Sequence, residues 1–75
     1  FANLQAAILC NQTACYLKIG DGPLAMEAAD RASEIMSTVD SAAGRKAAYR
    51  RACALEAVGE WDESRAVFKR VMAVD

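Results

Sequence analysis

The amino-acid sequence predicts an all-α protein built from paired helices. Of its 75 residues 55% are hydrophobic, yet much of this fraction is alanine and only 7% of the residues are aromatic. This composition favours thin, closely packed helices over sheets of β-branched and aromatic residues. Apolar residues also recur at helical spacing in four segments, which glycines separate. We therefore expect four antiparallel helices and no strand.

The first two helices are expected on either side of a glycine. Apolar residues follow a helical period from Leu4 to Ile19, and Gly20 is the residue type that most easily ends a helix in a left-handed turn. Pro23, which is favoured in the first turn of a helix, then opens a second segment. Its apolar face is formed by Leu24, Ala25, Ala28, Ala29, Ala32, Ile35 and Met36.

The second pair of helices follows a connector. Residues 38–44 are rich in small and capping residue types, and Asp40 or Ser41 could cap the third helix. This helix is expected to reach about Val58 and to end at Gly59. The fourth helix is expected over residues 61–74, where the apolar pattern of the second helix returns.

The two helix pairs form an internal repeat. When Gly20 is placed on Gly59, the repeat offset is 39 residues, and residues of similar size coincide. Thr13 falls on Ala52, Ala14 on Cys53, Tyr16 on Leu55, Ile19 on Val58, Ala25 on Ser64, Ala28 on Val67 and Ala32 on Val71.

This pattern resembles the tetratricopeptide repeat, a helix-turn-helix unit of about 34 residues with the signature W-x₂-L-G-x₂-Y…A-x₃-F…P. The second unit supplies Ala52, the turn GEWDES over residues 59–64 and Phe68, whereas the first unit supplies Tyr16, Ala25 and Ala32. Neither unit has the opening tryptophan, and Ala29 stands where the first unit should have an aromatic residue. The offset also exceeds the usual period, and we expect the five extra residues between Met36 and Lys46.

The resemblance implies a partial tetratricopeptide domain with residues 1–38 as one repeat and residues 39–75 as the next. About three stacked repeats are expected for a stable core, and the resemblance gives only two here. It therefore implies a fragment in which an upstream repeat and a C-terminal capping helix are absent. We therefore expect the isolated chain to associate with itself or to be loosely folded.

The segment GRKAAYRR, residues 44–51, holds four of the nine basic residues. Each residue of a helix advances about 100°, so Lys46 and Arg50 point within about 40° of each other. Arg51 lies about 100° from Arg50 and is expected to be ordinary solvated charge. The basic pair should point away from a core face formed by Ala48, Ala52 and Leu55.

The repeat register adds residues from the first helix to this basic pair. Asn11 lies nine positions before Gly20, as Arg50 does before Gly59, and asparagine is disfavoured inside helices. Lys18 points within about 20° of Asn11. We predict that Asn11, Lys18, Lys46 and Arg50 form one concave wall. Ala14, Tyr49, Cys10 and Cys53 are expected to line the groove.

The sequences CNQTACYLKIG and RKAAYRRACAL are similar to the second and third repeats of the tetratricopeptide domains of immunophilin co-chaperones, the large cyclophilin and FK506-binding types. That resemblance implies a cytoplasmic protein-binding module that holds the Glu-Glu-Val-Asp tail of a heat-shock chaperone in a carboxylate clamp. Asn11, Lys18, Lys46 and Arg50 would be its donors, and the Lys and Asn of the family's first repeat have no counterpart here. It implies no enzyme activity and no cofactor in these residues, although the parent protein could carry a separate peptidyl-prolyl isomerase domain.

Other interpretations stay open at this point. The basic pair could be simple solvated charge, and the chain could be a structural scaffold that binds another protein or helix without recognising a carboxylate. Nucleic-acid binding is disfavoured because the net charge is −1 and no basic stripe with interleaved aromatic residues is present. A membrane span is not expected, since no apolar run approaches about 18 residues.

The three cysteines do not indicate a further chemistry. Cys10, Cys15 and Cys53 have no CxxC spacing, and the chain has no histidine. We expect neither a disulfide framework nor a metal site, and no base is available to activate a nucleophilic thiol.

Overall fold

The computed structural model describes residues 2–36 and 42–72, which form four helices with turns at Gly20 and Gly59 and contain no strand. The predictions of an all-α fold and of helix breaks at Gly20 and Gly59 are confirmed. The connector was predicted too long, because residues 42–44 already belong to a helix, while Asp40 and Ser41 lie outside the described residues. The helices are α1 (Ala2–Lys18), α2 (Gly22–Ile35), α3 (Ala42–Ala57) and α4 (Trp61–Met72).

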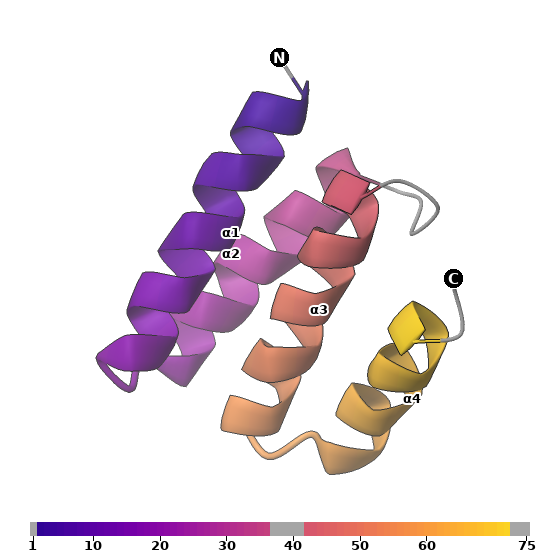
Figure 1. Cartoon of the computed structure of the whole chain (residues 1–75). Coiled ribbons are helices and arrows are strands. Elements are labelled where there is room, and N and C mark those ends of the chain that lie inside the picture. Colours follow the sequence, from indigo (N-terminus) through magenta and orange to yellow (C-terminus); the bar gives the residue numbers. More distant parts are fainter. Residues whose placement is uncertain (1, 37–41, 73–75) are drawn as a thin grey trace.

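The four helices form two antiparallel hairpins (Figure 1). Helix α2 contacts both α1 and α3, whereas α4 contacts α3 and makes no contact with α1 within the described residues. Helices α1 and α3 contact each other and run in the same direction, so that both hairpin turns lie at one end of the molecule (Figure 1). This arrangement leaves α1 and α3 side by side as one wall.

The first turn ends α1 with a pair of backbone hydrogen bonds. The Gly20 N–H donates to the Leu17 carbonyl at 3.2 Å, and the Asp21 N–H donates to the Tyr16 carbonyl at 2.8 Å. This is the Schellman arrangement, which needs a left-handed residue, and Gly20 has a φ of 81°. Asp21 then caps α2, since its Oδ1 accepts a bond from the Leu24 N–H at 3.1 Å.

The second turn repeats the first at the predicted offset. The Gly59 N–H donates to the Glu56 carbonyl at 3.1 Å, and the Glu60 N–H donates to the Leu55 carbonyl at 2.9 Å. Gly59 has a φ of 86°. The internal repeat seen in the sequence is therefore present in the hydrogen bonding of the backbone.

The core consists mainly of alanine. Ala25, Ala29, Ala32, Ala47, Ala52 and Ala54 are fully buried. The predicted core face of α3 is confirmed, since Ala48, Ala52 and Leu55 are all buried. Helices with methyl side chains at their contacts can approach one another closely. The high alanine content thus sets the spacing of the helices.

Two buried hydroxyl groups occupy equivalent helix contacts. The Thr13 Oγ1 donates to the Leu9 carbonyl within α1 at 2.8 Å, and the Ser64 Oγ donates across to the Ala52 carbonyl of α3 at 2.8 Å. In the repeat register Thr13 matches Ala52, and Ser64 matches Ala25. Each hairpin therefore combines one small hydroxyl residue with one alanine, and both hydroxyl groups have acceptors.

Replacement of either turn glycine by alanine should lower the free energy of unfolding by about 1 kcal/mol. A Cβ atom at Gly20 or Gly59 would meet no atom within 4 Å, so the cost comes from the left-handed backbone alone. Urea unfolding followed by circular dichroism measures the change. Gly59→Asn should cost less than Gly59→Ala, because asparagine tolerates this conformation better. If alanine and asparagine variants are as stable as the wild type, the turns do not depend on a positive φ.

Candidate functional site

Two basic residues of α3, Lys46 and Arg50, lie on the side of α3 that faces Cys10 of α1. Lys46 is exposed and Arg50 is half-buried, and both are close enough to the Cys10 thiol of α1 to influence it. Burial raises the pKa of this thiol, and the positive charges of Lys46 and Arg50 oppose part of the rise. Asn11, the next residue of α1, is exposed. In the wall formed by α1 and α3, the positive charges of Lys46 and Arg50 therefore lie near the helix that contains Asn11.

Arg50 has an unsatisfied donor within this wall. Its Nε atom is buried and has no hydrogen-bond partner among the described residues. A buried N–H group without an acceptor is costly, and such groups in folded proteins usually have a partner. Because the Nε atom is buried, an oxygen atom of a ligand or of water would satisfy it after a small movement of the Arg50 side chain.

Lys18 occupies the last turn of α1 and is exposed. It lies seven residues beyond Asn11, about 10 Å along the helix, toward the Gly20 turn. Its convergence with Lys46 and Arg50 stays a prediction.

The residues predicted to line the groove have different surroundings. Ala14 and Cys53 are half-buried, whereas Tyr49 is exposed and its ring forms a T-shaped pair with that of Phe68 of α4, 5.7 Å apart between ring centroids. Cys10 is only 1% exposed and packs with Ala32 and Ala47. The prediction that Cys10 lines the groove is therefore wrong, because its side chain belongs to the core.

The prediction that Arg51 is solvated charge is also wrong. Its Nε donates to Asp30 Oδ1 of α2 at 3.0 Å, and its Nη2 donates to Glu63 Oε2 of α4 at 2.8 Å. Partial burial alone would lower the pKa of Arg51, but these hydrogen bonds and the two negative charges outweigh it and raise the pKa. Arg51 thereby joins three helices.

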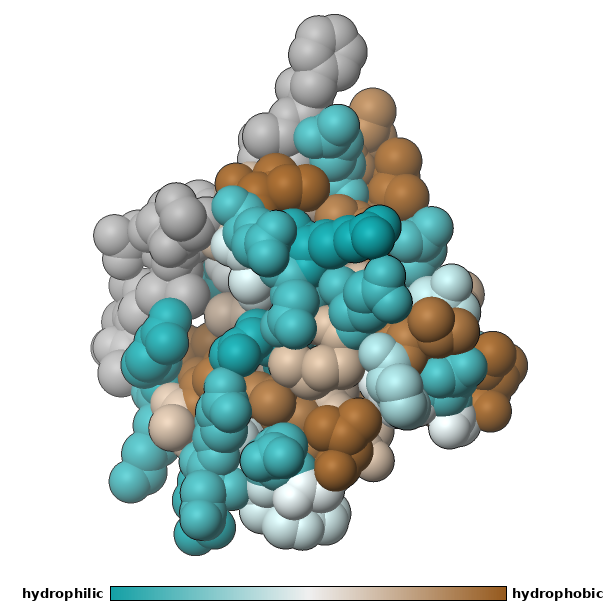
Figure 2. Space-filling model, turned by 180° about the vertical axis from the view of Figure 1, so that it is seen from behind, coloured by the Kyte–Doolittle hydropathy of each residue, from teal (hydrophilic) through white to brown (hydrophobic). Residues whose placement is uncertain are grey.

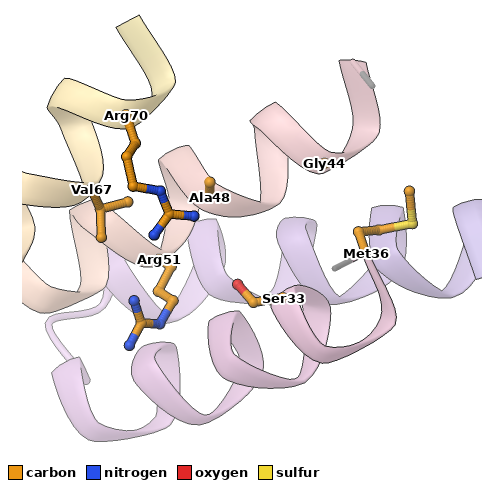
Figure 3. A pocket seen from close by; sticks show the side chains of 7 residues that line it. All are labelled: Ser33, Met36, Gly44, Ala48, Arg51, Val67 and Arg70. Carbon is orange, nitrogen blue, oxygen red and sulfur yellow. The ribbon is translucent and has the colours of Figure 1, made fainter. Parts of the chain in front are cut away.

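Arg51 also lines a pocket between α2, α3 and α4 with a volume of about 160 Å³ (Figure 3). The guanidinium of Arg70 and the hydroxyl of Ser33 face the same space (Figure 3). The two carboxylates bound to Arg51 already balance its charge, so the pocket lacks a strong excess of positive charge. None of the predicted site residues lines it.

The comparisons with known proteins give no further guide to the site. No protein-family model, curated protein or solved structure matches this chain. Within residues 2–36 and 42–72, no helix is long and apolar enough to cross a membrane, and no three metal-binding side chains come together.

Loss of the Arg51 side chain should destabilise the fold. Arg51→Ala removes both ion pairs, which are partly exposed, and we expect it to lower the free energy of unfolding by about 1 kcal/mol. Arg31→Ala is the matched control, since it breaks an exposed pair with Glu27 within one helix and should cost about 0.3 kcal/mol. Urea unfolding at low and high salt measures both, and the Arg51 effect should shrink with salt. Equal losses for the two variants would show that Arg51 does not join the helices.

The three thiols should differ in reactivity under native conditions. Cys15 is exposed, Cys53 is half-buried and Cys10 is buried, so labelling by a thiol reagent should be fastest at Cys15 and slowest at Cys10. The raised pKa of Cys10 further reduces its thiolate fraction. The folded state binds the proton of the Cys10 thiol more tightly than the unfolded state does. The contribution of Cys10 to the free energy of unfolding is therefore present below the ordinary pKa of 9.0 and declines as the pH rises above it.

Single-cysteine variants allow each rate to be measured separately, and unfolding in urea should make the three rates similar. Rapid native labelling of Cys10 would show that α1 is not packed on the core.

Proposed function

We propose that this chain is a protein-binding module that holds the acidic C-terminal peptide of a cytosolic heat-shock chaperone. In this proposal its four helices are two stacked tetratricopeptide repeats of the co-chaperone type. The wall of α1 and α3 is the binding surface, and the module binds its peptide without catalysing a reaction.

The observation that carries the proposal is the environment of Arg50. Its guanidinium and the Lys46 ammonium are close enough to Cys10 of α1 to influence that thiol, and its Nε donor has no acceptor among the described residues. A chain-terminal carboxylate offers several acceptor positions and a negative charge. Hydrogen bonds between charged partners are shorter and stronger than neutral ones. A carboxylate that draws the Arg50 side chain toward it would therefore satisfy a donor that has no partner among the described residues.

Each side chain has a chemical role that suits this ligand. Arg50 offers a planar fork of donors, and Lys46 is a compact point charge on the same side of α3. Asn11 donates through its amide without adding charge. Lys18, further along α1, would reach an acidic side chain of the peptide.

The repeated turns support the tetratricopeptide assignment. Both hairpins have the same pair of capping hydrogen bonds, and both have small residues where their helices cross. The parallel contact of α1 with α3 is the arrangement expected for the first helices of successive repeats.

Calorimetric titration with a peptide ending in Glu-Glu-Val-Asp tests the function. Lys46→Ala and Arg50→Ala should each weaken binding by about 2 kcal/mol, as expected for one charge-assisted hydrogen bond. Arg50→Ala should leave the stability of the free protein unchanged or raise it, because the variant also removes the unsatisfied Nε donor. Added salt should weaken the binding of the wild type.

The controls separate a specific clamp from general attraction between charges. Lys69→Ala removes one exposed positive charge from α4, which does not touch α1, and should leave affinity nearly unchanged. A peptide with an amidated C-terminus should bind as weakly as the clamp variants do to the free acid. If wild type, Lys46→Ala and Arg50→Ala bind equally well, the clamp is refuted and the scaffold interpretation is preferred.

A further inference from the structure

Helix α1 exposes a stripe of apolar residues and has almost no charge. Lys18 is the only charged residue among its 17 residues. Leu4 and Ile8 are 62% and 49% exposed, and Ile19, just after the helix, is 75% exposed. With Cys15 they lie within about 60° of one another around the helix axis. Figure 2 shows hydrophobic side chains along the edge of the molecule that α1 forms. Such a stripe is typical of a surface that another protein covers.

The internal repeat indicates what kind of surface fits this stripe. At the offset of 39 residues, Ile8 corresponds to Ala47 and Cys15 to Ala54, both on α3. These two alanines are fully buried. Ala47 packs in a cluster with Ala32 of α2, and Ala54 packs with Ala25 and Ala29 of the same helix. The face of α3 that matches the α1 stripe is therefore covered by the second helix of a hairpin.

The surface that would receive the stripe is present at the other end of the molecule. Residues of α2 that meet α3 have counterparts on α4, since Gly22 corresponds to Trp61, Ala29 to Phe68 and Ala32 to Val71. Trp61 is 61% exposed, and Phe68 and Val71 are half-buried. The positions of α4 that correspond to the α3-contacting positions of α2 thus form an apolar face.

We propose that α1 of one copy of this chain packs on α4 of a second copy, in the way that α3 packs on α2 within one copy. In this register Ile8 meets Val71, Cys15 meets Phe68, and Ile19 meets Trp61. The two faces are different, so the contact is head-to-tail. When two copies associate, one still exposes its α1 face and the other its α4 face. Further copies can therefore add at both ends, and open chains form.

The charges and side-chain sizes of the α1 and α4 faces are compatible with this contact and indicate how strong it is. The α1 stripe has no charged residue that could oppose the basic side chains of α4. Side chains larger than alanine on both faces place the helices toward the wider end of the usual 8–10 Å range of spacings. Asp30 and Arg51 correspond to Lys69 and Gln12, so the ion pair between α2 and α3 has no equivalent. The contact between copies is therefore weaker than the internal one and depends on concentration.

Sedimentation velocity over a range of protein concentrations tests the proposal. The wild-type chain should sediment faster as concentration rises, without a plateau at the dimer. Ile8→Glu on the α1 face and Trp61→Glu on the α4 face should each weaken association by about tenfold or more. Leu24→Glu is the matched control, since Leu24 is exposed on α2 outside both faces, and it should associate like the wild type. Circular dichroism verifies that the variants keep their helices.

Mixing the two variants distinguishes this contact from other modes of association. An equimolar mixture of Ile8→Glu and Trp61→Glu should form a dimer and nothing larger, because each variant keeps the face that the other lacks. A wild type that stays monomeric, a Trp61→Glu variant that still dimerises through α1 alone, or a mixture that stays monomeric would each overturn the proposal. The evidence for this contact does not rest on peptide binding, and neither assay uses the peptide.

Discussion

The contact between α2 and α3 determines the geometry of the remaining structure. It is built from alanines, with Ala25 and Ala29 packed on Ala54, and Ala32 on Ala47. Larger residues here would move the second hairpin away from the first. That shift would separate the basic residues of α3 from Cys10 and Asn11 of α1. The candidate site therefore depends on methyl groups that touch no ligand.

Arg50 and Arg51 are adjacent in the sequence and have opposite roles because the helix turns them about 100° apart. Arg51 is satisfied within the fold by Asp30 and Glu63 and fixes α3 against its neighbours. Arg50 faces Cys10 of α1, and its Nε donor is unpaired within residues 2–36 and 42–72. Arg51 stabilises the contacts between the helices, whereas the unpaired donor of Arg50 supports our proposal that the wall binds an anion. This division explains why loss of Arg51 is expected to affect stability and loss of Arg50 to affect binding.

Local chemistry allowed the sequence to predict the helix breaks at Gly20 and Gly59 and the exposure of Asn11 and Lys46. Gly20 and Gly59 determine their turns through their own backbone, and periodicity alone places side chains on a polar or apolar face. The predictions for Cys10 and Arg51 were wrong because the burial of each side chain depends on contacts with the other hairpin. A helical angle does not say which neighbour covers a face. The helical period contained part of the answer, since Arg51 lies between the buried residues Ala48 and Ala54 around the axis of α3 and so faces the neighbouring helices.

The two proposed surfaces of α1 are neighbours, which links their functions. Asn11 lies within about 60° of Ile8 and about 40° of Cys15 around the helix axis. If α1 packs on α4 of a second copy as α3 packs on α2, then α3 of that copy lies beside α1. Its Lys46 and Arg50 would extend the wall that begins at Asn11. A peptide held across both copies would favour association, and by linkage association would favour binding of the peptide. The same apolar stripe would then determine both the assembly of the chain and the length of acidic peptide that it can hold.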